Sequence, residues 1–238
     1  MNAGTLAQRL LAEFIGTALL LAAVVGSGTM GAALSGGNDG IALLANAGAT
    51  AGVLYVLIAV FAPVSGAHFN PAVTLAFRLR GEMSSGEAAA YVLVQVLGAV
   101  AGTLLAHAMF DLALVQPGLR VRSGIPQWTS EAVATCGLVM AILLGLRHRP
   151  DALPALVASY IFAAYWFTAS TSFANPAVTL ARALTRTFSG IRPADVPGFV
   201  LAQFAGVFVA LALVAALRLR TVPPGSAPPG CAPDRTAG

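Results

Sequence analysis

Long apolar segments separated by short polar loops make up most of the chain. Two further apolar segments, Asn70–Leu79 and Asn175–Leu184, are only about ten residues long, and as helices they would cross about half of a ~30 Å membrane core. This pattern predicts an all-α membrane protein with six transmembrane helices and two re-entrant half-helices. The six expected spans are about Leu10–Gly26, Ile41–Ala62, Ala88–Phe110, Glu131–Leu146, Ala152–Thr168 and Val196–Leu217.

The two short segments belong to an internal repeat. Each begins with the same string, Asn-Pro-Ala-Val-Thr-Leu-Ala, and each half also has a glutamate in its first apolar segment, Glu13 and Glu131. Each half carries three spans, an odd number, so the second half must enter the membrane in the opposite orientation. We expect a channel-like domain at 1–221, with repeats at about 8–112 and 128–218. The Pro-, Gly- and Ala-rich tail at 222–238 is expected to be disordered.

Charge supports a membrane location and indicates an orientation. Only 9% of the residues are charged, against about 25% in soluble domains. The net charge of +4 is too small an excess to indicate a nucleic-acid partner. All thirteen basic residues are arginines. With the N-terminus inside, Arg9, Arg78, Arg80, Arg147, Arg149, Arg218, Arg220 and Arg235 are inside, and Arg120, Arg122, Arg182, Arg186 and Arg192 are outside. Eight against five favours cytoplasmic termini.

The sequence offers little for metal binding or catalysis. Cys136 lies in an apolar run and Cys231 in the tail, and no group of cysteines and histidines has metal-ligand spacing. No nucleophile–base pair and no phosphate-binding loop are present. We therefore expect no metal, no cofactor and no enzymatic activity.

The repeated Asn-Pro pair has a physical meaning at the centre of a membrane. Asparagine is among the best helix N-caps and proline is favoured at the first helical position, so Asn70-Pro71 and Asn175-Pro176 each predict a helix start. Two half-helices entering from opposite faces would meet with their N-termini at the midplane. Their positive dipole ends oppose cations, and the asparagine amides could donate hydrogen bonds to a neutral solute.

These motifs resemble those of the aquaporin/glycerol-facilitator (major intrinsic protein) family, over roughly residues 8–218. The resemblance rests on the stretch from Ser65 to Thr74, on the second Asn-Pro-Ala and on the repeated glutamate. It implies a homotetramer in the membrane lipid, with one pore per subunit that conducts small neutral solutes without a cofactor. It also implies pore-lining Asn-Pro-Ala motifs, glutamates that support the re-entrant loops and a histidine in the cytoplasmic vestibule. Those residues are Asn70, Pro71, Ala72, Asn175, Pro176, Ala177, Glu13, Glu131 and His68.

The chain departs from the family pattern at the outer selectivity filter. The family usually has arginine directly after the second Asn-Pro-Ala, where this chain has Val178. By spacing, the other filter positions fall at Thr50, Ala163 and Ser172. Small side chains and a missing cation predict a wide filter, unless Arg182, Arg120 or Arg122 substitutes for the missing arginine.

Such a filter resembles that of the bacterial branch associated with arsenic-resistance operons. The resemblance implies a plasma (inner) membrane channel for glycerol-like polyols, arsenite and other metalloid hydroxides, methylated arsenicals and water. Two alternatives are a water- or glycerol-selective channel and a secondary transporter that couples to protons through Glu13 and Glu131.

Overall fold

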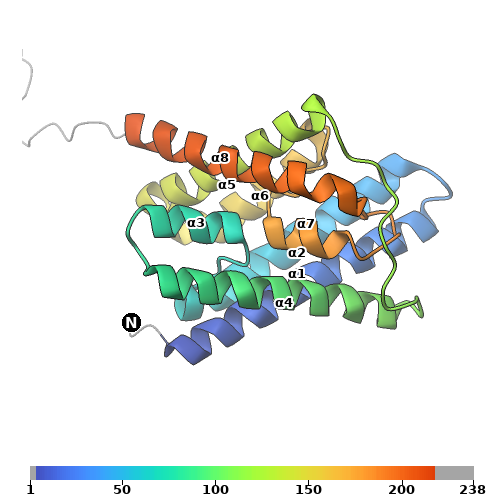
Figure 1. The fold of residues 1–238 in the computed structure, drawn as a ribbon, viewed down its shortest axis with the longest axis horizontal. Helices are drawn as coiled ribbons and strands as arrows, with labels where there is room; N and C mark the ends of the chain where they lie inside the picture. Colours follow the sequence, from blue (N-terminus) through green and yellow to red (C-terminus); the bar gives the residue numbers. More distant parts are fainter. Residues whose placement is uncertain (1–3, 218–238) are drawn as a thin grey trace, which may run out of the picture.

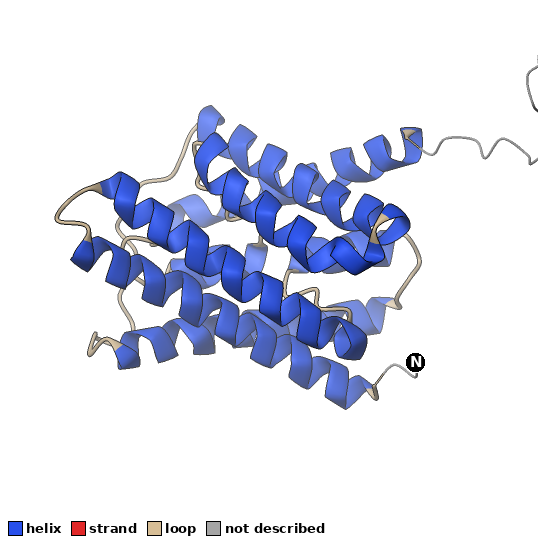
Figure 2. Cartoon of the chain, turned by 180° about the vertical axis from the view of Figure 1, so that it is seen from behind, coloured by secondary structure: helices blue, strands red, loops and turns tan. Residues whose placement is uncertain are grey.

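The computed structural model describes residues 4–217 and is entirely helical over this range, without a β-strand (Figures 1 and 2). The predicted tail at 222–238, and with it Arg218, Arg220 and Arg235, lies outside the described residues. The elements in chain order are α1 (Leu6–Leu34), α2 (Asp39–Ser65), α3 (Pro71–Leu79), α4 (Ser85–Met109), α5 (Ile125–His148), η1 (Pro150–Ala152), α6 (Leu153–Phe167), α7 (Pro176–Arg182), η2 (Pro193–Asp195) and α8 (Val196–Ala216). The predicted six long helices and two half-helices are all present.

The first helix is longer than predicted. The predicted span ends at about Gly26, but α1 continues to Leu34. The hydroxyls of Ser27 and Thr29 donate to the carbonyls of Ala23 and Val25, four residues back. Such back-bonding satisfies a hydroxyl inside an apolar environment without breaking the helix. Ser27 and Thr29 therefore do not end this helix.

Within residues 4–217, five helices are long and apolar enough to cross a membrane: α1, α2, α4, α5 and the segment from Pro193 to Ala216 that includes α8. The sixth, α6, has 15 residues, which at 1.5 Å per residue covers about 22 Å. The extended chain after Phe167 turns back into the protein as the second re-entrant loop. The short helix and this loop together take the place of one long helix in the bundle.

Close helix contacts occur in matching places in the two halves. A side-chain carbon at Gly98 of α4 would overlap the carbonyl of Phe14 in α1, and one at Gly206 of α8 would overlap the carbonyl of Ala132 in α5. Phe14 and Ala132 directly follow the two repeated glutamates. The pairs α1–α4 and α5–α8 therefore use the same small-residue packing. The half-helices α3 and α7 lie between α4 and α8, as Figure 1 shows.

Candidate functional site

Each half-helix begins at an asparagine that caps it. The Asn70 Oδ1 accepts a hydrogen bond from the backbone N–H of Ala72 at 2.8 Å. The Asn175 Oδ1 accepts from Ala177 N at 3.0 Å and from Val178 N at 3.3 Å. Pro71 and Pro176 occupy the first helical turn. The local signals in the sequence thus place both helix starts.

The two asparagines also join the halves of the protein to each other. Asn70 Nδ2 donates to the carbonyl of Ala174 at 2.7 Å, and Asn175 Nδ2 donates to the carbonyl of Phe69 at 2.8 Å. Each acceptor is the residue directly before the opposite asparagine. A side-chain amide has two N–H donors, so each asparagine retains a second N–H. This reciprocal tie was not predicted from the sequence.

The loops that precede the asparagines share an unusual backbone. Ala67 and Phe69 have φ of 51° and 49°, and the equivalent residues Ser172 and Ala174 have φ of 49° and 48°. Non-glycine residues rarely adopt this left-handed conformation and need surrounding contacts to hold them in it. The contacts come from the two buried glutamates.

Glu13 binds the first re-entrant loop. Its two carboxylate oxygens accept hydrogen bonds from Ser65 Oγ (2.7 Å), His68 N (2.9 Å), Phe69 N (2.7 Å) and Gln95 Nε2 (2.8 Å). Glu13 is fully buried and does not line the cavity described below. Every hydrogen bond places it in a supporting position behind the loop.

Glu131 holds the second loop in the same way. It accepts from Phe173 N and Ala174 N, both at 2.9 Å, and from Gln203 Nε2 at 2.6 Å. Gln203 also donates to Thr179 Oγ1 in α7, as Gln95 does to Thr74 Oγ1 in the first half. Sequence reasoning missed both glutamines. The available signal was a single glutamine within the long helix that follows each half-helix.

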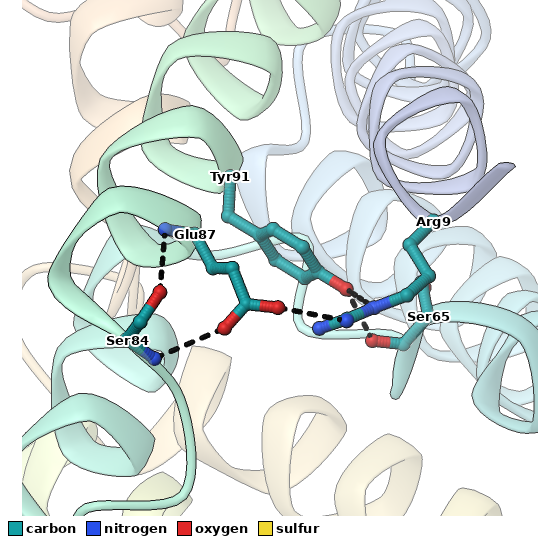
Figure 3. Close-up of polar contacts among 5 residues, drawn as sticks. All are labelled: Arg9, Ser65, Ser84, Glu87 and Tyr91. Atoms are coloured by element: carbon teal, nitrogen blue, oxygen red, sulfur yellow. Dashed lines mark hydrogen bonds and ion pairs between the residues drawn. The ribbon is translucent and has the colours of Figure 1, made fainter. Parts of the chain in front are cut away.

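A polar cluster, drawn in Figure 3, lies at the end of the bundle at which Figure 1 marks the N-terminus, and this end is called the inner end below. Arg9 Nε donates to Tyr91 Oη at 2.8 Å, and Arg9 Nη1 pairs with Glu87 at 3.0 Å. Tyr91 Oη donates in turn to the carbonyl of Ser65 at 2.9 Å. Glu87 forms a capping box with Ser84 at the start of α4. The cluster thereby joins the starts of α1 and α4 to the end of α2, directly before the first re-entrant loop.

A cavity of about 210 Å³ runs past the two asparagines and is lined by every long helix except α4 and α8. Phe77, Leu146 and Leu153 line its inner end, and Thr50, Val178 and Arg182 line its outer part. Most of the wall is apolar. Since a water molecule has a share of about 30 Å³ in the liquid, this volume holds several small molecules in sequence.

The structure brings most of the expected site residues to this cavity. The lining includes Asn70, Asn175, Thr50, Ser172, Val178 and His68. His68 stacks on Phe77 with ring centroids 4.5 Å apart, and its Nδ1 lies 3.1 Å from Thr74 Oγ1. The motif residues Pro71, Ala72, Pro176 and Ala177 are buried in the half-helices and are not part of the lining.

The expected filter position Ala163 needs correction. Ala163 is exposed on the outer surface of α6 and does not line the cavity, whereas Ile161 and Tyr165 do. A helix turns by about 100° per residue, so a shift of two residues moves a side chain to the opposite face. The Tyr165 hydroxyl donates to Thr50 Oγ1 at 3.3 Å. A phenol therefore occupies the side of the pore that was expected to carry only a methyl group.

Arg182 is the second residue that changes the expected picture. Its side chain is 1% exposed, lines the cavity and lies with its guanidinium carbon 3.4 Å from the centroid of the Phe173 ring. It follows Val178 by one helical turn. The structure thus places a guanidinium at the outer part of the cavity although position 178 is apolar.

The asparagine tie leads to a stability prediction. We expect Asn175→Ala to lower the free energy of unfolding more than an ordinary cap loss of about 1 kcal/mol, because it also leaves the buried carbonyl of Phe69 without a donor. Asn38→Ala is the matched control, since Asn38 caps α2 in an exposed position. Thermal unfolding in detergent compares the two variants. Equal losses would contradict a stabilising role for the tie.

Known proteins resemble this chain in sequence. The profile of the family described as "Major intrinsic protein" matches residues 1–165. The "Aquaglyceroporin AqpS" of Rhizobium meliloti (strain 1021) is 57% identical over 209 residues, covering 88% of this chain and 89% of that protein. The "Probable aquaporin PIP2-8" of Oryza sativa subsp. japonica is 41% identical over 99 residues, covering 42% of this chain and 35% of that protein.

Among solved structures, the X-ray structure of the aquaglyceroporin from Plasmodium falciparum has the same fold. It superimposes with a TM-score of 0.70 at 17% sequence identity, and covers 89% of this chain and 95% of that chain.

Proposed function

Because the chain belongs to the major intrinsic protein family, an integral-membrane family of channels rather than enzymes, we propose that it conducts small neutral hydroxylated solutes passively. The solutes we propose are glycerol-like polyols, arsenite and other metalloid hydroxides, methylated arsenicals and water. The observation that carries the proposal is the cavity that passes both Asn-Pro-Ala asparagines and has Val178, not arginine, directly after the second motif, with Arg182 one turn further along α7.

The chemistry of the lining favours neutral solutes that carry hydroxyl groups. The N-termini of α3 and α7 meet at the cavity, and their partial positive charges oppose cations. The retained N–H donors of Asn70 and Asn175 offer hydrogen bonds to a solute oxygen, while the apolar wall suits its carbon skeleton. The name of a bacterial relative supports the same class of solutes, since this 57% identical protein is called an aquaglyceroporin.

The position of the two glutamates favours a channel over a proton-coupled transporter. Glu13 and Glu131 accept hydrogen bonds from the loops and lie outside the cavity lining. A coupling carboxylate would need access to the permeation path. We therefore assign them the supporting role.

We also propose how the protein sits in the cell. The bacterial relative supports a plasma (inner) membrane location, and the distribution of arginines supports cytoplasmic termini. Large apolar side chains are exposed along the outer faces of the long helices, where they suit lipid or neighbouring subunits. We propose a homotetramer with one pore in each subunit and a channel domain that extends to residue 221, with repeats at about 8–112 and 128–218.

Stopped-flow measurements in proteoliposomes test the function. They compare water, glycerol, urea, neutral arsenite and methylarsonic acid, with protein-free vesicles as the baseline. We expect downhill, non-accumulating flux of glycerol and arsenite well above the baseline. Flux of water alone would contradict the proposed solute range and favour a water-selective channel, and accumulation driven by a proton gradient would favour a transporter.

A further inference from the structure

Two buried arginines lie beside Phe173 near the outer end of the cavity, and of the two only Arg182 lines the cavity itself. Arg182 comes from α7, and Arg122 comes from the loop between α4 and α5. Their guanidinium carbons lie 3.4 Å and 5.0 Å from the centroid of the same ring, that of Phe173. Two cations from distant parts of the chain are thereby held against one aromatic residue of the second re-entrant loop.

Arg182 has a free donor at this place. Its Nε donates to the carbonyl of Ser189, but its buried Nη1 has no hydrogen-bond partner in the part of the chain that the structure describes. Helical side chains lean toward the N-terminus of their helix, so a residue covers the turn before its own position. Arg182 therefore covers the turn that carries Val178, next to the cavity that both residues line.

Arg122 is fixed as a neighbouring charge. Its Nε donates to the carbonyl of Gly190 at 3.0 Å, and its Nη1 donates to the carbonyl of Ser170 at 3.0 Å. Burial, followed by the charges of Arg182 and Arg120, lowers the pKa of Arg122 to about 9. At neutral pH, Arg122 therefore remains a cation. Its backbone carbonyl partners orient it but do not neutralise it.

Neither cation has a carboxylate partner within residues 4–217. The ion pairs found there are Arg9–Glu87, Arg80–Glu82 and Arg192–Asp195.

Two carboxylates near these cations, Asp195 and Glu131, are engaged elsewhere. Asp195 pairs with Arg192 and accepts the backbone N–H of Arg122, and Glu131 accepts from the second re-entrant loop and Gln203. Buried charges are normally paired, because desolvation makes an isolated one costly. The two buried guanidiniums therefore lack a counter-charge, and one of them has an unused donor. A bound anion would supply both the counter-charge and the hydrogen-bond acceptor.

We propose that Arg182, with Arg122 as the supporting charge, forms a binding site for a small oxyanion at the outer end of the pore. Arg182 Nη1 donates to an anion oxygen, a geometry for which the planar guanidinium is well suited. The inference rests on the proposed function, because the anion occupies the same cavity as the neutral solutes. A bound oxyanion therefore slows the entry of neutral solutes from the outside.

The test measures binding and flux separately on the full chain. Calorimetry in detergent titrates phosphate or formate, with chloride at equal ionic strength as the reference. Stopped-flow glycerol entry is then measured with the same anions outside the vesicles. We expect both oxyanions to bind and to slow glycerol entry more than chloride does. Arg182→Gln should raise the half-saturating anion concentration by about tenfold or more, the effect of losing one charge-assisted hydrogen bond.

Two further variants keep the assignment falsifiable. Arg186→Gln is the matched control, since Arg186 is an exposed arginine four residues after Arg182, beyond the end of α7, and it should leave binding unchanged. Arg182→Lys keeps the charge but removes the planar fork, so it should weaken binding less than Arg182→Gln and also tests the site if the glutamine variant fails to fold.

The outcomes separate this site from the channel function. Normal glycerol flux without oxyanion binding would overturn the anion site and leave the channel function intact. Equal binding by wild type and Arg182→Gln would overturn the role of Arg182. Oxyanion binding in a protein that conducts no glycerol would support the site and count against the proposed function.

Discussion

Replacing Val178 with arginine is expected to reduce the flux of solutes larger than water by about tenfold or more, a factor that about 1.4 kcal/mol of added barrier supplies. Val178 lines the outer part of a cavity of only about 210 Å³, and an arginine there would fill space that a bulky solute must pass. It would also place a second cation one turn from Arg182, where like charges repel. Water should be affected less, because it needs the least space.

The measurement is stopped-flow flux of water, glycerol, urea and arsenite in proteoliposomes with equal amounts of protein. Val178→Leu is the control, since it adds a methylene group without adding charge or donors. We expect this control to reduce bulky-solute flux only slightly. If Val178→Arg conducts bulky solutes as fast as wild type, the narrowest point lies elsewhere, and the contact of Tyr165 with Thr50 becomes the first candidate.

Glu131→Leu is expected to abolish the accumulation of folded protein. The substitution leaves three buried donors, on Phe173, Ala174 and Gln203, without their acceptor. Each unsatisfied group costs about 1–3 kcal/mol, and the sum approaches the 5–15 kcal/mol that stabilises a typical native protein. The loop would also lose the contacts that hold Ser172 and Ala174 at positive φ. Size-exclusion chromatography and thermal unfolding in detergent measure the loss.

Glu87→Gln provides the matched control for removing a carboxylate. Glu87 is partly exposed and pairs with Arg9 near the inner end, so its loss should lower the stability far less than the loss of Glu131. A Glu131→Leu variant that folds as well as wild type would contradict the supporting role. If it folded but lost only proton-driven accumulation of solute, the glutamate would be a coupling group instead.

The helices and the centre of the site could be predicted because their signals are local. The length of the apolar segments predicts the membrane spans, and the Asn-Pro pairs at Asn70 and Asn175 indicate where each half-helix begins. The repeated string and the repeated glutamate predict the inverted arrangement. The C-terminal end of α1 could not be predicted in this way. The hydroxyls of Ser27 and Thr29 bond to carbonyls four residues back, and these bonds exist only once the helix has formed.

The outer wall of the pore was harder to predict, because it depends on helix rotation and on long side chains. Counting back from Asn175 selected Ala163, but a count of residues does not fix the rotation of α6, and Tyr165 faces the cavity instead. Arg182 was considered only as one of three possible substitutes for the missing arginine. Its place at the cavity follows from the direction of its side chain and from the Phe173 ring, neither of which is visible in the order of residues.

The reciprocal tie between Asn70 and Asn175 also constrains the order of assembly. Its two hydrogen bonds join residues that are 104 and 106 positions apart in the chain. While the ribosome is still synthesising the second half, the first half has its Asn70 amide and its Phe69 carbonyl without their partners. The three long helices of the first half must therefore reside in the membrane before the two hydrogen bonds at the centre of the bundle can form. The centre of the bundle can be completed only after the second re-entrant loop has been synthesised, because that loop carries Ala174 and Asn175.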